Sequence, residues 1–310
     1  MRTLHVVMGL GGRAGQRSRA LATVREAATA AGWAIQEIEL DALAHLDAGD
    51  RAVLCGGDGL IHKALPFVAD REVEVAIVPV GTGNDFVRAF GVTGRNAGPR
   101  SIATAVDPTA PATAVDLLRA EDDDGTGERW AASVVTFGFS GRVTDTANGL
   151  RFPPGSSKYT AAALLEIGRL EARPATLTIV PSDAGNDSRI DTGRPIEGDV
   201  ALAAIANTAW FGGGMQICPD ARADDGRLDV LTIGDAGRLE FARWLPKVFR
   251  GAHTTHDAVT TATGVSVRVE TDEALWADGE EWGHAPTTIT VVPGALQLVV
   301  PCAAVPEVKA

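Results

Sequence analysis

The sequence predicts an α/β protein: an N-terminal domain around a parallel sheet, followed by a β-rich domain that forms an antiparallel sandwich. Strand and helix patterns alternate over the first part of the chain, whereas short strand patterns dominate the rest. The length of 310 residues also exceeds the ~250–300 residues that one hydrophobic core usually organises. We expect residues 1–112 in the first domain and 113–293 in the second, with a strand at 294–310 packing back on the first.

The N-terminal segment alternates between strands and helices. In Ser18–Ala31, the side chains Leu21, Val24 and Ala28 recur at helical spacing, and Gly32 ends the helix. The other elements that we expect are the strands Leu4–Met8, Trp33–Leu40, Ala52–Cys55 and Val73–Val80, and the helix Leu60–Val68. This order is typical of a parallel sheet with helices on its faces.

The remaining chain is richer in strand patterns. We expect strands at Val115–Leu118, Trp130–Phe139, Ala175–Val180, Val200–Asn207, Leu228–Ile233, Val265–Val269, Thr288–Val292 and Leu296–Val300. Helices are expected at 142–149, 157–171 and 237–249. The polar, glycine-containing segments Asp122–Glu128 and Ser182–Arg194 are expected to be exposed loops. Consecutive strands with few helices between them favour an antiparallel arrangement.

The composition is that of an ordinary globular protein, with 45% hydrophobic and 22% charged residues. A net charge of −12 argues against a nucleic-acid-binding surface and against a general attraction to anionic membranes. No apolar run reaches the ~18 residues of a membrane span. The three cysteines are far apart, which argues against a zinc site or a disulfide framework and favours a cytoplasmic location.

Two glycine-rich segments follow predicted strands and open predicted helices: Gly56-Gly57-Asp58-Gly59 and Gly81-Thr82-Gly83-Asn84-Asp85. Glycines let backbone N–H groups approach a phosphate, and a following helix adds its positive N-terminal end. Because both loops follow strands of one parallel sheet, they converge on the edge where ligands of open α/β sheets bind. A carboxylate such as Asp58 beside phosphates requires Mg²⁺ or a hydrogen-bond donor between them. The alternative is an ordinary Asp-Gly turn that caps a helix.

A third glycine cluster, Gly9–Gly15, lies between the first strand and the first helix and fits the pattern G-x-G-x-x-A. Glu37, Glu39 and Asp41 end the next strand, near the offset at which dinucleotide-binding folds place a ribose-binding carboxylate. This segment supports an NAD(P)-dependent oxidoreductase as a competing interpretation. We rank that function last because it leaves the segments 81–86, 207–230 and 278–280 unexplained.

Three segments of the second domain contain candidate functional residues. Asn207–Met215 is a glycine-dense turn after a strand, and Pro219–Val230 contains a compact acidic loop before one. One carboxylate and the backbone carbonyls of such a loop can bind a cation. Taken alone, an exposed acidic turn explains the loop better. In Asp278-Gly279-Glu280, two carboxylates flank a glycine at a tight turn, and one of them is a candidate general base.

Together these segments resemble the bacterial diacylglycerol kinase family, the soluble lipid kinases related to sphingosine kinases and NAD kinases. The resemblance covers nearly the whole chain, and its segments follow the family's order. They are Gly56–Gly59, Gly81–Phe86, Phe137–Phe139, Lys158-Tyr159, Asn207–Met215, Pro219–Val230, Gly251–His253 and Asp278–Glu280. The second glycine loop and the segment 207–230 are the most specific of these.

The resemblance implies a kinase that uses ATP and Mg²⁺ to phosphorylate a hydroxyl of diacylglycerol or a related lipid, in the cleft between the two domains. By this resemblance the ATP site is lined by Gly56, Gly57, Asp58, Gly59 and Thr82, to which the glycine-loop argument adds Gly81 and Asn84. Asp58 would join the Mg²⁺–water network at the phosphates, and Glu280 would be the general base. Asp225 would hold a structural Mg²⁺ together with the main-chain oxygens of Arg222 and Arg227.

The sequence also departs from the family pattern. Leu60 stands where relatives carry a threonine, His62-Lys63 replaces an Asn-Glu pair, and Ser140 stands where an aspartate is usual. These departures keep open the alternative of a catalytically weak relative that binds a nucleotide or a lipid. A kinase of a soluble alcohol on the same fold is a further alternative.

The segment Leu239–Phe249 combines apolar and basic side chains. It is either a helix that enters a lipid interface locally or a core-facing helix with a basic solvent face. The partners that we expect are a lipid or other hydroxyl substrate, a peripheral contact with the inner membrane surface and a second copy in a homodimer. We expect no nucleic-acid partner.

Overall fold

The computed structural model describes residues 2–9, 14–81, 83–121, 127–150, 157–182 and 195–301. The chain divides into two compact units, of which unit 1 is Met1–Leu117 with Pro293–Ala310 and unit 2 is Leu118–Val292. The chain passes between the units within the strands β5 (Thr113–Glu121) and β18 (Thr287–Val299). The two predicted polar loops fall mostly outside the described residues.

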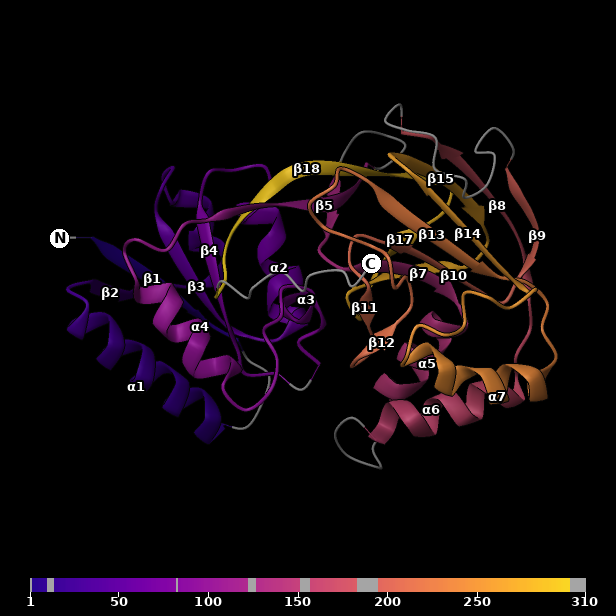
Figure 1. The fold of residues 1–310 in the computed structure, drawn as a ribbon, viewed down its shortest axis with the longest axis horizontal. Coiled ribbons are helices and arrows are strands. Elements are labelled where there is room, and N and C mark those ends of the chain that lie inside the picture. The colour runs from indigo at the N-terminus through magenta and orange to yellow at the C-terminus, as the bar shows by residue number, and fades with distance from the viewer. Residues whose placement is uncertain are drawn as a thin grey trace, which may run out of the picture. The chain divides into compact units, whose positions relative to one another are not determined.

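Unit 1 is an α/β unit (Figure 1). Its elements are β1 (Thr3–Met8), α1 (Ala14–Ala30), β2 (Ala34–Glu37), the 3-10 helix η1 (Leu40–His45), β3 (Arg51–Gly56), α2 (Asp58–Val68), β4 (Glu74–Pro79), α3 (Asp85–Ala89) and α4 (Ala97–Val106). The strands β2, β1, β3 and β4 are parallel neighbours in that order, and the C-terminal part of β18 adds a further parallel strand beside β4.

The helices of unit 1 cover its sheet because their apolar side chains recur at helical spacing. Val24 and Ala28 of α1 and Ile102 and Ala105 of α4 form one buried cluster with the sheet. α2 packs against β3 and η1 through a separate set of buried residues. This arrangement leaves the carboxyl ends of β3 and β4 for loops, and each loop leads directly into a helix.

Unit 2 contains most of the strands. Its elements are β6 (Glu128–Ala131), β7 (Val134–Gly138), α5 (Phe139–Gly149), α6 (Ser157–Gly168), β8 (Arg173–Val180), β9 (Ile196–Val200), β10 (Leu202–Ala206), β11 (Trp210–Phe211), β12 (Met215–Gln216), β13 (Leu228–Ile233), α7 (Arg238–Val248), β14 (Val259–Gly264), β15 (Ser266–Thr271), β16 (Ala274–Ala277) and β17 (Glu280–His284). A six-stranded antiparallel sheet runs in the order β14-β13-β10-β7-β16-β17.

The six-stranded sheet of unit 2 is buried on both faces. One face shares a core with β8, β9, β15 and the first part of β18, where Phe137, Ile205, Leu177 and Val267 are buried together. The other face is covered by α5, α6 and α7 (Figure 1). The sandwich core and the parallel sheet of unit 1 confirm the predicted fold class.

Some element boundaries differ from the prediction. Trp33–Leu40 is strand only as far as Glu37, and a 3-10 helix begins at Leu40. Trp130–Phe139 contains two strands that are broken after Ala131, whereas the two strands predicted between Thr288 and Val300 are one strand, β18. The helix α4 and the strands β9, β11, β12, β14, β16 and β17 were not predicted.

We find no helix, among the residues that the structure describes, that is long and apolar enough to span a bilayer.

Candidate functional site

The two glycine loops of unit 1 touch each other at the carboxyl edge of the sheet. β3 and β4 are parallel neighbours, and Gly56 at the end of β3 is in register with Pro79 at the end of β4. A Cβ atom on Gly81 would lie 2.8 Å from the Cα of Gly57, and one on Gly57 would lie 3.1 Å from the Cα of Gly81. This approach requires glycine on both sides, so the backbones themselves form the surface of the site.

Asp58 connects the two loops. It stands in the first turn of α2, and its Oδ1 accepts a hydrogen bond of 3.2 Å from the backbone N–H of Phe86 in the first turn of α3. Asn84, in the left-handed conformation with φ 51°, donates from Nδ2 to the carbonyl of Gly81 at 2.8 Å. These bonds hold the starts of both helices beside the glycines, where backbone N–H groups and helix dipoles favour an anion.

The predicted nucleotide-site residues are therefore largely brought together. Gly56, Gly57, Asp58, Gly81 and Asn84 lie in the two touching loops. Gly59 follows Asp58 in the first turn of α2, and Thr82 lies outside the described residues.

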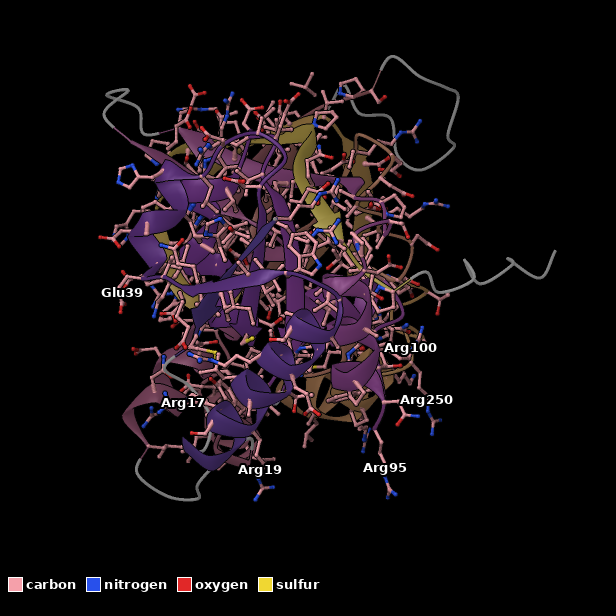
Figure 2. The ribbon with its side chains drawn as sticks, turned by 90° about the vertical axis from the view of Figure 1, so that its left-hand side faces the viewer. Arg17, Arg19, Glu39, Arg95, Arg100 and Arg250 are labelled. Atoms are coloured by element: carbon pink, nitrogen blue, oxygen red, sulfur yellow. The ribbon has the colours of Figure 1, made fainter. Side chains whose placement is uncertain are left out.

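A cavity of about 390 Å³ adjoins the second glycine loop, lined by Gly81, Gly83, Asn84, Arg88, Thr93 and Arg95 among others. Arg88 donates to the carbonyl of Gly83 at 3.1 Å and lies 3.6 Å from the carboxylate of Asp85. Figure 2 shows Arg95 and Arg100 extending outward from this part of unit 1. Sequence reasoning did not identify these arginines, because nothing in the motif indicated that the segment after α3 folds back on the loop.

Apolar and neutral groups lie beneath the first loop. A Cβ atom on Gly56 would lie 2.6 Å from the Leu60 Cδ2, and one on Gly9 would lie 3.4 Å from the same atom. Leu60 therefore covers the backbone where relatives are expected to present a hydroxyl. Burial raises the pKa of the Cys55 thiol to about 12, which keeps it neutral and unreactive.

The predicted base, Glu280, follows a tight turn in unit 2. Asp278 and Gly279 connect β16 to β17 with φ values of 52° and 90°. The Asp278 carboxylate accepts hydrogen bonds of 2.9 Å from the backbone N–H groups of both Ala132 and Ser133. Asp278 therefore holds this turn against the chain between β6 and β7, directly before Glu280.

The two glutamates of β17 project to opposite faces of the sheet. Glu280 pairs with Ala277, a residue of the sandwich core, whereas Glu281 pairs with Trp276. Successive side chains of a strand alternate between faces. Glu281 and Trp276 both line a cavity of about 590 Å³, which lies on the face away from Glu280.

That second cavity is strongly charged. Arg142 bonds to the Glu273 carboxylate at 2.5 Å and to the carbonyl of Glu171 at 3.1 Å. Glu166 is buried in its wall and accepts a bond of 2.8 Å from the Thr146 hydroxyl. Sequence reasoning missed this cavity, because its charged residues come from α5, α6, β8, β17 and the segments before β8 and β16, without a local motif.

The acidic loop before β13 is ordered by its own contacts. Asp225 Oδ1 accepts a hydrogen bond of 3.0 Å from the backbone N–H of Arg227, and Arg222 forms an ion pair with Asp224 at 3.0 Å. Over the described ranges, no three His, Cys, Asp or Glu side chains gather in a metal-binding group. The Mg²⁺ site predicted at Asp225 does not require such a group. One carboxylate and main-chain oxygens are ligands that a hard cation binds.

A second motif segment packs against this region. A Cβ atom on Gly251 would lie 2.7 Å from the Pro219 ring, and the buried His253 lies 2.8 Å from the carbonyl of Ile217 through its Nε2. Burial lowers the pKa of His253, so its ring is neutral. His253 therefore has a structural role, because it bonds to the chain just before the acidic loop.

Two family models match this chain. The model described as the diacylglycerol kinase catalytic domain matches residues 10–119, and the model described as the YegS C-terminal NAD kinase β-sandwich-like domain matches residues 133–300. The first match ends close to the end of β5, and the second begins near the start of β7.

Similar proteins carry related names. A protein of Mycobacterium tuberculosis named diacylglycerol kinase is 36% identical over 253 residues, which are 81% of this chain and 77% of that protein. A Stenotrophomonas maltophilia protein named "Probable lipid kinase YegS-like" is 30% identical over 262 residues, covering 81% of this chain and 79% of its own.

A solved structure from Bacillus anthracis, titled as a diacylglycerol kinase, superposes with a TM-score of 0.69 over 96% of each chain. The two sequences are 19% identical, so this likeness concerns the fold.

Proposed function

Because the chain belongs to the diacylglycerol kinase family, we propose that it transfers the terminal phosphoryl group of ATP to a hydroxyl of diacylglycerol or a related lipid. The observation that carries this proposal is the pair of touching glycine loops that Asp58 bonds together. Phosphoryl transfer depends mainly on positioning and charge stabilisation, and backbone N–H groups at two helix starts are suited to both.

The proposal assigns distinct roles to the residues around the phosphates. Gly56, Gly57, Gly59, Gly81 and Asn84 are proposed to supply the backbone and amide groups that receive ATP. Gly81 is exposed and Gly57 is half-buried. Thr82 is proposed as a further contact. Mg²⁺ supplies charge neutralisation when bound, and Asp58 is proposed to hold its water network.

Glu280 is proposed as the general base. Its carboxylate accepts the proton of the lipid hydroxyl while the hydroxyl oxygen forms its bond to the terminal phosphorus, and the bond between that phosphorus and the bridging oxygen of ADP breaks. Asp278 positions Glu280 by fixing the turn that precedes it. Asp225 and the main-chain oxygens of Arg222 and Arg227 are proposed to hold a structural Mg²⁺.

The roles of Asp58 and Glu280 are tested by conservative variants. Asp58→Asn and Glu280→Gln retain the shape of the side chain and remove its charge. We expect each to lower transfer from ATP to diacylglycerol in mixed micelles by about 100-fold or more. The matched controls are Asp70→Asn, an exposed site with positive φ in unit 1, and Glu281→Gln on the opposite face of β17. Full activity of either site variant would remove that residue from the proposal.

The charged cavity of unit 2 lies on the face of β17 away from Glu280, so it supplies no acceptor site beside the proposed base. The alternative acceptor is a soluble alcohol that would bind at Glu280 itself. Its phosphorylated product would stay in the aqueous phase after extraction, whereas a lipid product would enter the organic phase.

Two expectations about location and assembly accompany this proposal. A lipid acceptor requires contact with a membrane surface, for which we propose the inner face of the cytoplasmic membrane. A homodimer stays a prediction, which the mass measured by light scattering would test.

A further inference from the structure

The helix α6 presents apolar side chains to solvent and a carboxylate to the interior. Leu164 is 68% exposed and Leu165 is 50% exposed, whereas Glu166 is 4% exposed. Ala161 and Gly168 share the outward stripe with the two leucines, at the spacing i, i+3, i+4, i+7. A surface helix usually has the opposite polarity. The outward stripe of α6 is therefore an exposed apolar patch, a feature typical of interaction surfaces.

The helix α7 lies beside α6 in the same layer (Figure 1). Ala163 and Ile167 of α6 pack into one core cluster with Phe241 and Trp244 of α7. Because both helices bury these faces against the same sheet, their opposite faces form one continuous surface of unit 2.

The outward stripe of α7 alternates apolar and cationic side chains. Leu239, Arg243, Pro246 and Arg250 follow at i, i+4, i+7 and i+11, and Leu239 is 76% exposed. Phe249, directly after the helix, is 52% exposed. Long cationic side chains beside apolar ones are typical of helices that lie in a lipid interface.

The charge on α7 contrasts with that of the whole chain. Arg238, Arg243, Lys247 and Arg250 lie between residues 238 and 250 of a protein with a net charge of −12. The acid of this segment, Glu240, lies 3.1 Å from His256. Figure 2 shows Arg250 extending into solvent. The surface is therefore locally basic although the protein is acidic.

We infer that the α6–α7 face, defined by Leu164, Leu165, Leu239, Arg243, Phe249 and Arg250, docks on an anionic lipid bilayer. The leucines and Phe249 enter the interface, and the arginines reach the anionic headgroups. A second copy of the chain fits this face less well, because a twofold contact would place two basic surfaces against each other. The inference rests on the proposed lipid kinase function, since it names the surface that brings such an enzyme to its acceptor.

The test is co-sedimentation of the full chain with phosphatidylcholine vesicles, with and without phosphatidylglycerol at about one lipid in three. We expect binding to the anionic vesicles only. The double variants Leu164→Glu/Leu165→Glu and Arg243→Glu/Arg250→Glu should each lower the partition coefficient by about tenfold or more. The control is Val180→Glu, which places a charge at an apolar side chain of β8 that is 50% exposed.

The side chains changed are exposed, so thermal unfolding of the variants should match that of the parent chain, and Leu165→Gln provides a milder change if it does not. Equal binding to neutral and anionic vesicles, or unchanged binding of the double variants, would overturn the inference. If the chain does not bind vesicles but forms a dimer that the leucine variants dissociate, the face binds a second copy. That result would also overturn the inference.

The docking test is independent of catalysis because it contains no ATP. In a separate assay with short-chain diacylglycerol dispersed in solution, the double variants should keep the activity of the parent chain. If the parent chain binds vesicles but transfers no phosphoryl group to diacylglycerol, either in mixed micelles or in the short-chain assay, the proposed function is wrong. The docking face is then still supported. Activity with no vesicle binding would defeat the docking face alone.

Discussion

Asp58 has a structural task that can be separated from its proposed catalytic task. Its Oδ1 accepts the Phe86 N–H, a hydrogen bond that asparagine can also accept through its side-chain carbonyl. We expect Asp58→Asn to keep the free energy of unfolding of the parent chain, and Asp58→Ala to lower it by about 1 kcal/mol. Urea denaturation measures both. Equal stability of the two variants would show that the bond between the loops contributes nothing.

Asp278 is expected to matter for stability more than for chemistry. Removing its carboxylate leaves the buried backbone N–H groups of Ala132 and Ser133 without their acceptor. We expect Asp278→Ala to lower the free energy of unfolding by about 2–4 kcal/mol. The exposed neighbour Asp272→Ala serves as the control and should change it by less than about 0.5 kcal/mol. A small effect of Asp278→Ala would contradict the role that we assign to the turn.

These two aspartates show what the sequence reveals at the scale of a residue. The motifs indicated that Asp58 and the Asp278–Glu280 turn belong to functional sites. The bond from Asp58 to Phe86 spans 28 residues, and that from Asp278 to Ala132 spans 146. Contacts this distant in sequence depend on the tertiary fold, so the structural role of Asp278 could not be predicted.

Within the two glycine loops, the contact itself can be tested. A methyl group on Gly81 would meet the Cα of Gly57 at 2.8 Å and Asn84 Oδ1 at 2.9 Å. The loops must then separate, which displaces the N–H groups proposed to receive the nucleotide. We expect Gly81→Ala to weaken ATP binding by about tenfold or more in calorimetry, which corresponds to ~1.4 kcal/mol.

The control for the loop variant is Gly149→Ala at the end of α5 in unit 2, where a new methyl group meets nothing within 4 Å. It should leave ATP affinity unchanged. Unaltered affinity in Gly81→Ala would mean that ATP does not bind at these loops.

His253 connects the end of α7 with the start of the acidic loop and makes that connection sensitive to pH. Burial lowers its pKa below the ordinary value of 6.5, so the unfolded chain binds the proton more readily than the folded one. The contribution of the neutral His253 to the free energy of unfolding is therefore complete above about pH 6.5. It is lost as the pH falls through the lowered pKa. His253→Gln, which can still donate to the Ile217 carbonyl, should reduce this decline in urea denaturation at about pH 7.5 and pH 5.5.

The control for this prediction is the parent chain, measured at the same two pH values. An identical decline in His253→Gln and the parent chain would assign the effect to other groups.

Element boundaries were predicted less well than element types, for identifiable reasons. The strand expected over Trp130–Phe139 is broken because the Ala132 and Ser133 N–H groups bond to Asp278 instead of a neighbouring strand. In β18, Pro293 and Gly294 suggested a break, but the Gly294 N–H donates to Asp116 at 2.9 Å and the strand continues.

At the scale of the molecule, the alternation of strands and helices was enough to predict a parallel sheet in one part and a sandwich in the other. Hydrophobic periodicity determines which face of each element is buried, and that information is local. The inverted polarity of α6, whose two leucines are exposed, was not predicted. A helix whose apolar stripe faces solvent follows the same sequence pattern as one whose stripe faces the core, so this distinction requires the structure.

The most direct test of the lipid kinase proposal is the partition of label after incubating the chain with γ-labelled ATP, Mg²⁺, a total lipid extract and an aqueous metabolite pool. We predict label in the organic phase, with loss of that label in Glu280→Gln and its retention in Glu281→Gln. Label confined to the aqueous phase, or no transfer by the folded protein to either phase, would contradict the lipid kinase proposal.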